Sequence, residues 1–124
     1  MYAPENLPFV NSPQSFSLSQ RENKYQMGYW NGINGQYVVS GNVGGKWHHI
    51  AATRTNKSLS FYIDGRLIGS SPTPAGSGPY SLVSEYLVGY GYNNGYQYWK
   101  GSLDDLRIYN RVLSATELSN LAKF

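Results

Sequence analysis

The sequence predicts a single all-β domain, and its length and composition are the observations that predict it. The chain has 124 residues, which is the usual size of one domain. Charged residues make up 14% of the chain, whereas a typical soluble domain has roughly 25%. The 14 glycines, 6 prolines and 12 tyrosines favour turns and strands over helices. The absence of cysteine excludes disulfides, thiolate metal sites and a cysteine nucleophile.

The first residues differ from the rest of the chain. Residues 1–13 contain three prolines and no periodic pattern, so we expect a proline-rich N-terminal arm. The domain itself is expected to occupy residues 14–124. The start of the chain has neither the basic nor the apolar segment of a signal peptide, so we expect no signal peptide here.

Alternating apolar and polar residues predict the strands of the domain in order. In the first part we expect short strands at 15–19, 25–30 and 36–40. The last two are separated by Asn31-Gly32 and Asn34-Gly35, because Asn-Gly supplies the positive φ angles of tight turns.

The central part of the chain has the most regular pattern. We expect strands at 47–53 and 58–64, and large apolar residues at every second position give the later strand one buried face. The Asp64-Gly65 pair then predicts a tight hairpin turn into a strand at 66–68.

The C-terminal part alternates loops and strands before a helix. The expected elements are a Ser/Pro/Gly loop at 70–80, a strand at 82–90, a loop at 91–97 and a strand at 98–109. In this last strand, Leu106 and Ile108 are expected to share a buried face. Ser114 and Glu117 have the spacing of a capping box, which predicts a short C-terminal helix. About eight short strands predict two antiparallel sheets packed face to face.

Two segments resemble a known family. They are GGKWHHIAATRTNKSLSFYIDGRLIG at residues 44–69 and YWKGSLDDLRIYNRVLSATELSNLA at residues 98–122, and both resemble the laminin-G-like, concanavalin A-like jelly-roll domains. The resemblance implies an antiparallel jelly-roll β-sandwich with a short C-terminal helix. Members of the family usually carry one or more strands earlier in the chain. We therefore expect a sandwich that is abbreviated at its N-terminus, or a chain that is a fragment of a larger secreted or phage-tail protein.

Aromatic and amide side chains in the region 90–99 indicate a ligand-binding site. Sugar rings stack on aromatic faces, and amides can hydrogen-bond to sugar hydroxyls. The predicted ligand-binding residues are Tyr90, Tyr92, Asn93, Asn94, Tyr96, Tyr98 and Trp99. The alternative is that these tyrosines simply fill strand positions, where tyrosine is common. For a second group (Tyr25, Tyr29, Trp30, Asn31 and Asn34) packing is the favoured interpretation.

Two positions raise the question of a metal. Asp104 would share a strand face with apolar residues and be partly buried, so it needs a partner. The resemblance to glucanase-type jelly rolls implies a structural Ca²⁺ at Asp104, and the alternative is a hydrogen bond to backbone amides or a histidine. His48 and His49 are adjacent in a strand and face opposite ways, so we expect two separately hydrogen-bonded histidines. Asp105 and Arg107 are expected to form an exposed ion pair.

The remaining features separate the function classes. The four Glu and three Asp lack the paired ExDxxE spacing of related glucanases, and no GxSxG motif occurs, so we expect no enzyme. The net charge of +3 comes from scattered basic residues, which argues against nucleic acid as a partner. No stretch reaches the roughly 18–20 apolar residues of a membrane span.

The function that we expect is a non-catalytic recognition or adhesion module that binds a glycan or a cell-surface protein. The resemblance implies that it is extracellular, surface-associated or virion-associated as part of a larger protein, with no cofactor beyond that calcium. The alternative is a structural module that self-assembles as a homo-oligomer through an exposed edge strand or an aromatic surface.

Overall fold

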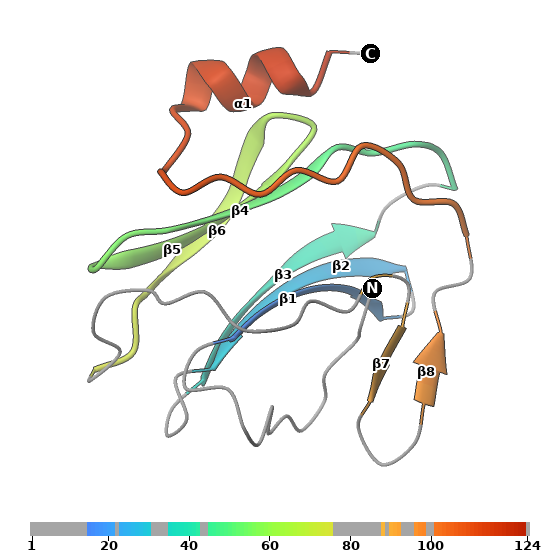
Figure 1. Ribbon diagram of the computed structural model, residues 1–124, viewed down its shortest axis with the longest axis horizontal. Helices are drawn as coiled ribbons and strands as arrows, with labels where there is room; N and C mark the ends of the chain where they lie inside the picture. The colour runs from blue at the N-terminus through green and yellow to red at the C-terminus, as the bar shows by residue number, and fades with distance from the viewer. Residues whose placement is uncertain are drawn as a thin grey trace.

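Antiparallel pairing organises the described strands into two three-stranded sheets and one hairpin (Figure 1). The computed structural model describes residues 15–21, 23–30, 35–42, 45–75, 88, 90–92, 96–98 and 101–123. Sheet A has the order β1-β2-β3, with β1 at Ser15–Arg21, β2 at Lys24–Trp30 and β3 at Gly35–Asn42. Sheet B has the order β4-β5-β6, with β4 at Ile50–Arg54, β5 at Ser58–Ile63 and β6 at Arg66–Pro72. The hairpin consists of β7 (Tyr90–Tyr92) and β8 (Tyr96–Tyr98), and helix α1 spans Ala115–Leu121.

The hydrophobic core lies between the two sheets, which are stacked in Figure 1. It is built from alternate residues of the two central strands, β2 and β5. These residues are Tyr25, Met27, Tyr29, Leu59, Phe61 and Ile63, and none is more than 8% exposed. Burial of one such side chain contributes on the order of 1.5–3 kcal/mol, so this cluster dominates the stability of the sandwich. The predicted arrangement of two antiparallel sheets packed face to face is confirmed.

The sheets approach each other closely where β3 meets β6. A Cβ atom on Gly69 would lie 2.9 Å from Cγ1 of Val38, which is too short for ordinary contact. Glycine at this position of β6 therefore lets Val38 pack against the backbone of the opposite sheet. Strand β6 is longer than predicted and includes the first residues of the expected loop at 70–80.

The turn between β5 and β6 has the predicted conformation. Asp64 has a φ of 52° and Gly65 a φ of 75°, as a two-residue turn with both central residues in the left-handed region requires. Gly65 also packs against the C-terminal helix, because a Cβ on this residue would lie 2.8 Å from Cα of Ser119. The turn is thus a contact point between sheet B and α1.

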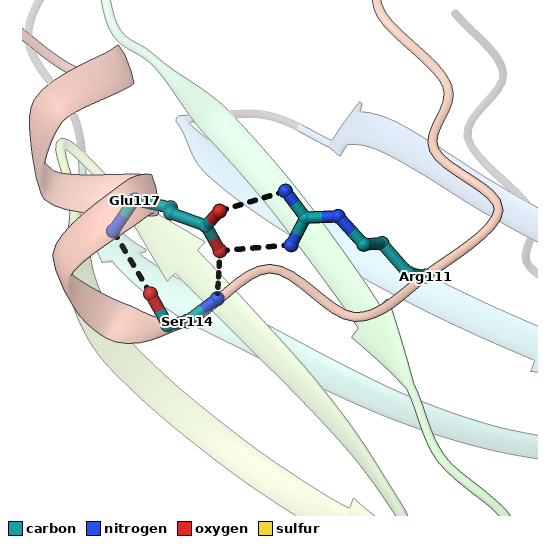
Figure 2. Close-up of polar contacts among 3 residues, drawn as sticks. All are labelled: Arg111, Ser114 and Glu117. Carbon is teal, nitrogen blue, oxygen red and sulfur yellow. Dashed lines mark hydrogen bonds and ion pairs between the residues drawn. The ribbon is translucent and has the colours of Figure 1, made fainter.

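Helix α1 begins with the predicted capping box (Figure 2). Glu117 N donates to Ser114 Oγ at 3.2 Å, and Ser114 N donates to Glu117 Oε2 at 2.8 Å. Arg111 adds a bidentate ion pair to the same carboxylate, at 2.7 and 3.0 Å. The hydrogen bonds from Arg111 and from the backbone of Ser114 lower the pKa of Glu117 from 4.5 to about 2. Within the described residues no helix is long and apolar enough to cross a membrane.

The prediction of a strand over 98–109 is correct at Tyr98 and wrong for residues 101–109, while residues 99 and 100 lie outside the described residues. Residues 101–112, which we call the strap, have no strand conformation and are all exposed. Asp105 has a φ of 52°, which interrupts an extended run of residues. The expected buried face is therefore wrong as well, because Leu106 and Ile108 are exposed. Figure 1 shows the strap as an elongated trace in orange and red that leads to α1.

Two other boundaries differ from the prediction. Residues 47–49 lie outside a strand, because β4 begins only at Ile50. The expected loop at 91–97 is wrong where β7 and β8 form a hairpin. Most of the expected strand at 82–90, like the N-terminal arm at 1–13, lies outside the described residues.

Candidate functional site

The hairpin of β7 and β8 contains four of the seven residues predicted to bind a ligand. Its register pairs Tyr90 with Tyr98 and Tyr92 with Tyr96, with Gly91 opposite Gln97 between them. Residues alternate between the two faces of a strand, and directly paired residues share a face. The four tyrosine positions therefore lie on one face of the hairpin, and the Gly91–Gln97 pair lies on the other. Asn93, Asn94 and Trp99 fall outside the described residues, so the site as a whole stays a prediction.

The register also sets the spacing of the four tyrosine positions. Same-face neighbours along one strand are separated by two residues, or about 6.5–7 Å. Paired positions across the strands are about 4.5–5.5 Å apart. Two tyrosine pairs thus follow each other along the hairpin. The sequence contained a signal for this arrangement, since Tyr-Gly-Tyr and Tyr-Gln-Tyr alternate on either side of Asn93-Asn94-Gly95.

A second polar group joins the segment before β4 to the β5–β6 turn. His48 Nδ1 lies 2.8 Å from Asp64 Oδ2, and the His48 side chain is only 7% exposed. The other carboxylate oxygen of Asp64 accepts a hydrogen bond from His49 N at 2.9 Å, and Asp64 N donates to His49 O at 2.8 Å. These three contacts of Asp64 therefore hold the β5–β6 turn against the segment that precedes β4.

The electrostatics of this group are those of a structural contact. Burial alone would raise the pKa of Asp64, but the hydrogen bonds from His48 and His49 and the nearby Lys46 outweigh it and lower this pKa. The ring of Tyr25 packs edge-on against His48 at 5.8 Å, and burial with the nearby Asp64 charge raises the pKa of Tyr25. Because His48 is buried, its imidazole is poorly placed to contact a dissolved substrate.

The prediction of two separately hydrogen-bonded histidines is correct for His48 through Nδ1. Nδ1 of His49 and Nε2 of His48 are buried and have no hydrogen-bond partner among the described residues, and for the His49 side chain the expectation stays a prediction. The contribution of His49 to this contact is made by its backbone. The sequence does not predict the contact of the Asp64 carboxylate with His48 and His49. The Asp64-Gly65 pair indicates only a turn.

Two residues of the second aromatic group are part of the core. Tyr25 and Tyr29 are buried between the sheets, which confirms the packing interpretation for these two residues. The guanidinium of Arg54 lies 5.3 Å from the centre of the Tyr29 ring, within the range of a cation–π contact. Asn31 and Asn34 lie outside the described residues, as does the side chain of Trp30.

Asp104 lies in the strap and is exposed, so the expectation that it is partly buried is wrong. The reason is the absence of a strand that would turn its face toward the core. Its Oδ1 accepts a hydrogen bond from Asp105 N at 2.8 Å. Arg107 occupies both carboxylate oxygens of Asp105, at 2.8 and 3.0 Å, as the predicted exposed ion pair. In the described part of the chain no three His, Asp or Glu side chains converge, and calcium at Asp104 stays a prediction.

Comparisons with known proteins agree with this fold. The family model Laminin_G_3, described as the concanavalin A-like lectin/glucanases superfamily, matches residues 6–119. No curated protein matches the chain significantly. The chain is similar in structure to part of an S-layer domain-containing protein from Clostridium thermocellum, with a TM-score of 0.53 and 22% identity. That match covers 98% of this chain and 69% of the other, and at this identity it supports the fold alone.

Proposed function

Since the chain belongs to the concanavalin A-like lectin/glucanase superfamily, we propose that it is a non-catalytic recognition module that binds carbohydrate. The observation that carries this proposal is the register of the β7–β8 hairpin, which assigns four tyrosine positions to one face. Aromatic rings offer a large, rigid surface at a low cost in conformational entropy, and the hydroxyl of tyrosine adds a polar contact.

The residues next to these tyrosines support a sugar ligand. Asn93 and Asn94 lie between the two strands in the sequence, and Trp99 follows directly after β8. Amide side chains both donate and accept hydrogen bonds, which suits the paired donor and acceptor character of sugar hydroxyls. Two tyrosine pairs in succession favour a ligand with at least two sugar units over a single sugar.

The acidic side chains of the described residues support a binding function over catalysis. A glycosidase needs two carboxyl groups flanking the scissile bond, roughly 5–9.5 Å apart. Here Asp64 contacts His48, Asp105 is paired with Arg107, and Glu117 is occupied by Arg111. Each of these carboxylates therefore already has a structural partner.

The setting that we propose is a cell or virion surface, where the module would bind a glycan or a glycosylated surface protein. A surface location is in keeping with the description of the structural neighbour as S-layer domain-containing, although the match itself carries only the fold. The scattered positive charge of +3 neither requires nor favours a nucleic acid as the partner.

Glycan-array binding of purified protein tests this function. We expect wild-type protein to bind a defined set of oligosaccharides, and Tyr92→Ala or Tyr96→Ala to weaken binding about tenfold, or ~1.4 kcal/mol. Gln97→Ala is the matched control, because Gln97 lies on the opposite face of the same hairpin. The proposal fails if folded wild-type protein binds no glycan, or if Gln97→Ala weakens binding as much as the tyrosine variants do.

A further inference from the structure

The strap carries an unusual concentration of exposed apolar side chains. Five large ones lie within ten residues, and each is 40–66% exposed: Leu103, Leu106, Ile108, Tyr109 and Val112. Single exposed apolar residues are normal on a protein surface, whereas a continuous group of them marks an interaction site. The strap therefore has the composition of a contact surface that is uncovered in the isolated chain.

The backbone of the strap has no strand partner among the described residues. Apart from the bond from Asp105 N to the neighbouring Asp104 side chain, no backbone hydrogen bond joins it to the rest of the described chain. Its C-terminal end is held firmly, because Arg111 is paired with Glu117 and the following Leu113 is buried. An anchored segment whose N–H and C=O groups have no backbone partner in the described part of the chain is a template for an added strand.

The charge pattern of the strap indicates which strand would be added. Asp105 and Arg107 flank Leu106 on either side. If two straps pair antiparallel about a two-fold axis at Leu106, each Asp105 lies opposite Arg107 of the second copy. Opposite charges in directly paired positions stabilise a sheet, and like charges destabilise it. A two-fold axis at Asp105 or at Arg107 would place like charges opposite each other, so the Leu106 register is the complementary one.

We propose that the strap pairs with the strap of a second copy of this chain, forming a two-fold symmetric dimer. Antiparallel strand addition is the form of pairing that such an axis produces. Leu106 meets its own copy at the axis, and Ile108, on the same face as Leu106, lies opposite Asp104 of the second copy. Asp105 leaves its left-handed conformation, at a φ of 52°, for the extended one that non-glycine residues prefer.

Cysteine cross-linking tests the geometry, because the chain has no cysteine of its own. Directly paired positions in antiparallel strands are close enough for a disulfide. We expect Leu106→Cys to form a disulfide-linked dimer under mild oxidation. Leu67→Cys is the control, since Leu67 lies on β6 and is 57% exposed, and it should stay monomeric on the same gel. Equal cross-linking of the two variants would overturn the proposal.

Charge reversal tests the register. Sedimentation velocity of the wild type should show a concentration-dependent dimer, and Arg107→Asp should abolish it by placing Asp opposite Asp. The double variant Asp105→Arg/Arg107→Asp restores opposite charges and should restore the dimer. Thermal melting checks that every variant is folded. A wild type that stays monomeric at all concentrations overturns the proposal, as does a double variant that is folded but monomeric. Glycan binding is a separate measurement, so each proposal can fail without the other.

Discussion

Strand β5 and the strap have similar sequences and opposite surroundings. Residues 59–63 read LSFYI and residues 105–108 read DLRI, and in both, large apolar residues stand at every second position. In β5 the apolar residues are the centre of the core, whereas in the strap they are exposed. The difference lies in the neighbours, because β5 is hydrogen-bonded on both sides and covered by β2, and the strap has no such partners among the described residues. Alternation therefore indicates which residues share a face, and only the neighbours determine whether that face is buried.

The largest loss of stability should come from truncating a core side chain of β5. Phe61→Ala is expected to lower the free energy of unfolding by about 3–5 kcal/mol, since Phe61 is fully buried and a cavity would remain. Ile108→Ala in the strap should change it by no more than about 0.5 kcal/mol. Urea denaturation at low protein concentration, where dimers dissociate, measures both. A large loss in Ile108→Ala would show that the strap is packed within the monomer.

The turn that ends β5 should be the next most sensitive point. Gly65→Ala is expected to cost about 2 kcal/mol, because Gly65 has a positive φ and its new Cβ would meet Ser119. Gly45→Ala is the matched control, since a Cβ there meets nothing within 4 Å. Denaturation midpoints of the two variants test this. If Gly45→Ala were the more damaging change, the contact between the turn and α1 would not stabilise the fold.

Two acidic groups outside the strap, Glu117 and Asp64, should make the stability of the fold depend on pH. The lowered pKa of Glu117, about 2 instead of 4.5, means that its contacts stabilise the folded state above pH 4.5. This stabilisation is lost as the pH falls through about 2. The lowered pKa of Asp64 acts in the same direction. Glu117→Gln and Asp64→Asn should therefore melt earlier than wild type near neutral pH and converge with it in strong acid.

The strap supplies the control for this pH effect. At low protein concentration, where dimers dissociate, Asp105→Asn removes only an exposed ion pair, which is worth about 0–1 kcal/mol, and should leave the midpoint almost unchanged at every pH. Melting curves at neutral and acid pH give the comparison. A marked shift in Asp105→Asn would mean that the ion pair is desolvated, as it would be in a stable dimer.

The smallest effect is expected from a chelator. Calcium prefers 6–8 oxygen ligands. The neighbouring carboxylate that could join Asp104 as a ligand is that of Asp105, and it already forms an ion pair with Arg107. Adding a chelator should therefore leave the melting temperature unchanged. A clear decrease, absent in Asp104→Asn, would instead support the structural calcium that the resemblance implies.

The parts of the fold that the sequence predicted correctly depend on local interactions. The turn at Asp64-Gly65 needs two residues that tolerate positive φ, and the capping box needs Ser114 and Glu117 three positions apart. The strand patterns of sheets A and B depend on alternation, which a single segment displays by itself. For the candidate site, tyrosines and amides could be selected from the sequence by their chemistry. The hairpin that pairs the tyrosine positions was not predicted, because a loop was expected at 91–97.

Contacts between separate segments decided the rest. The pairing of β7 with β8 assigned four tyrosine positions to one face, since register depends on two segments together. The contact between His48 and Asp64 joins residues 16 positions apart, so no local pattern predicts it. The strap also shows that a local pattern is not enough. Its alternation is that of a buried strand, yet Leu106 and Ile108 are exposed. Burial is a property of a residue and its neighbours in space, and a sequence pattern describes only the residue.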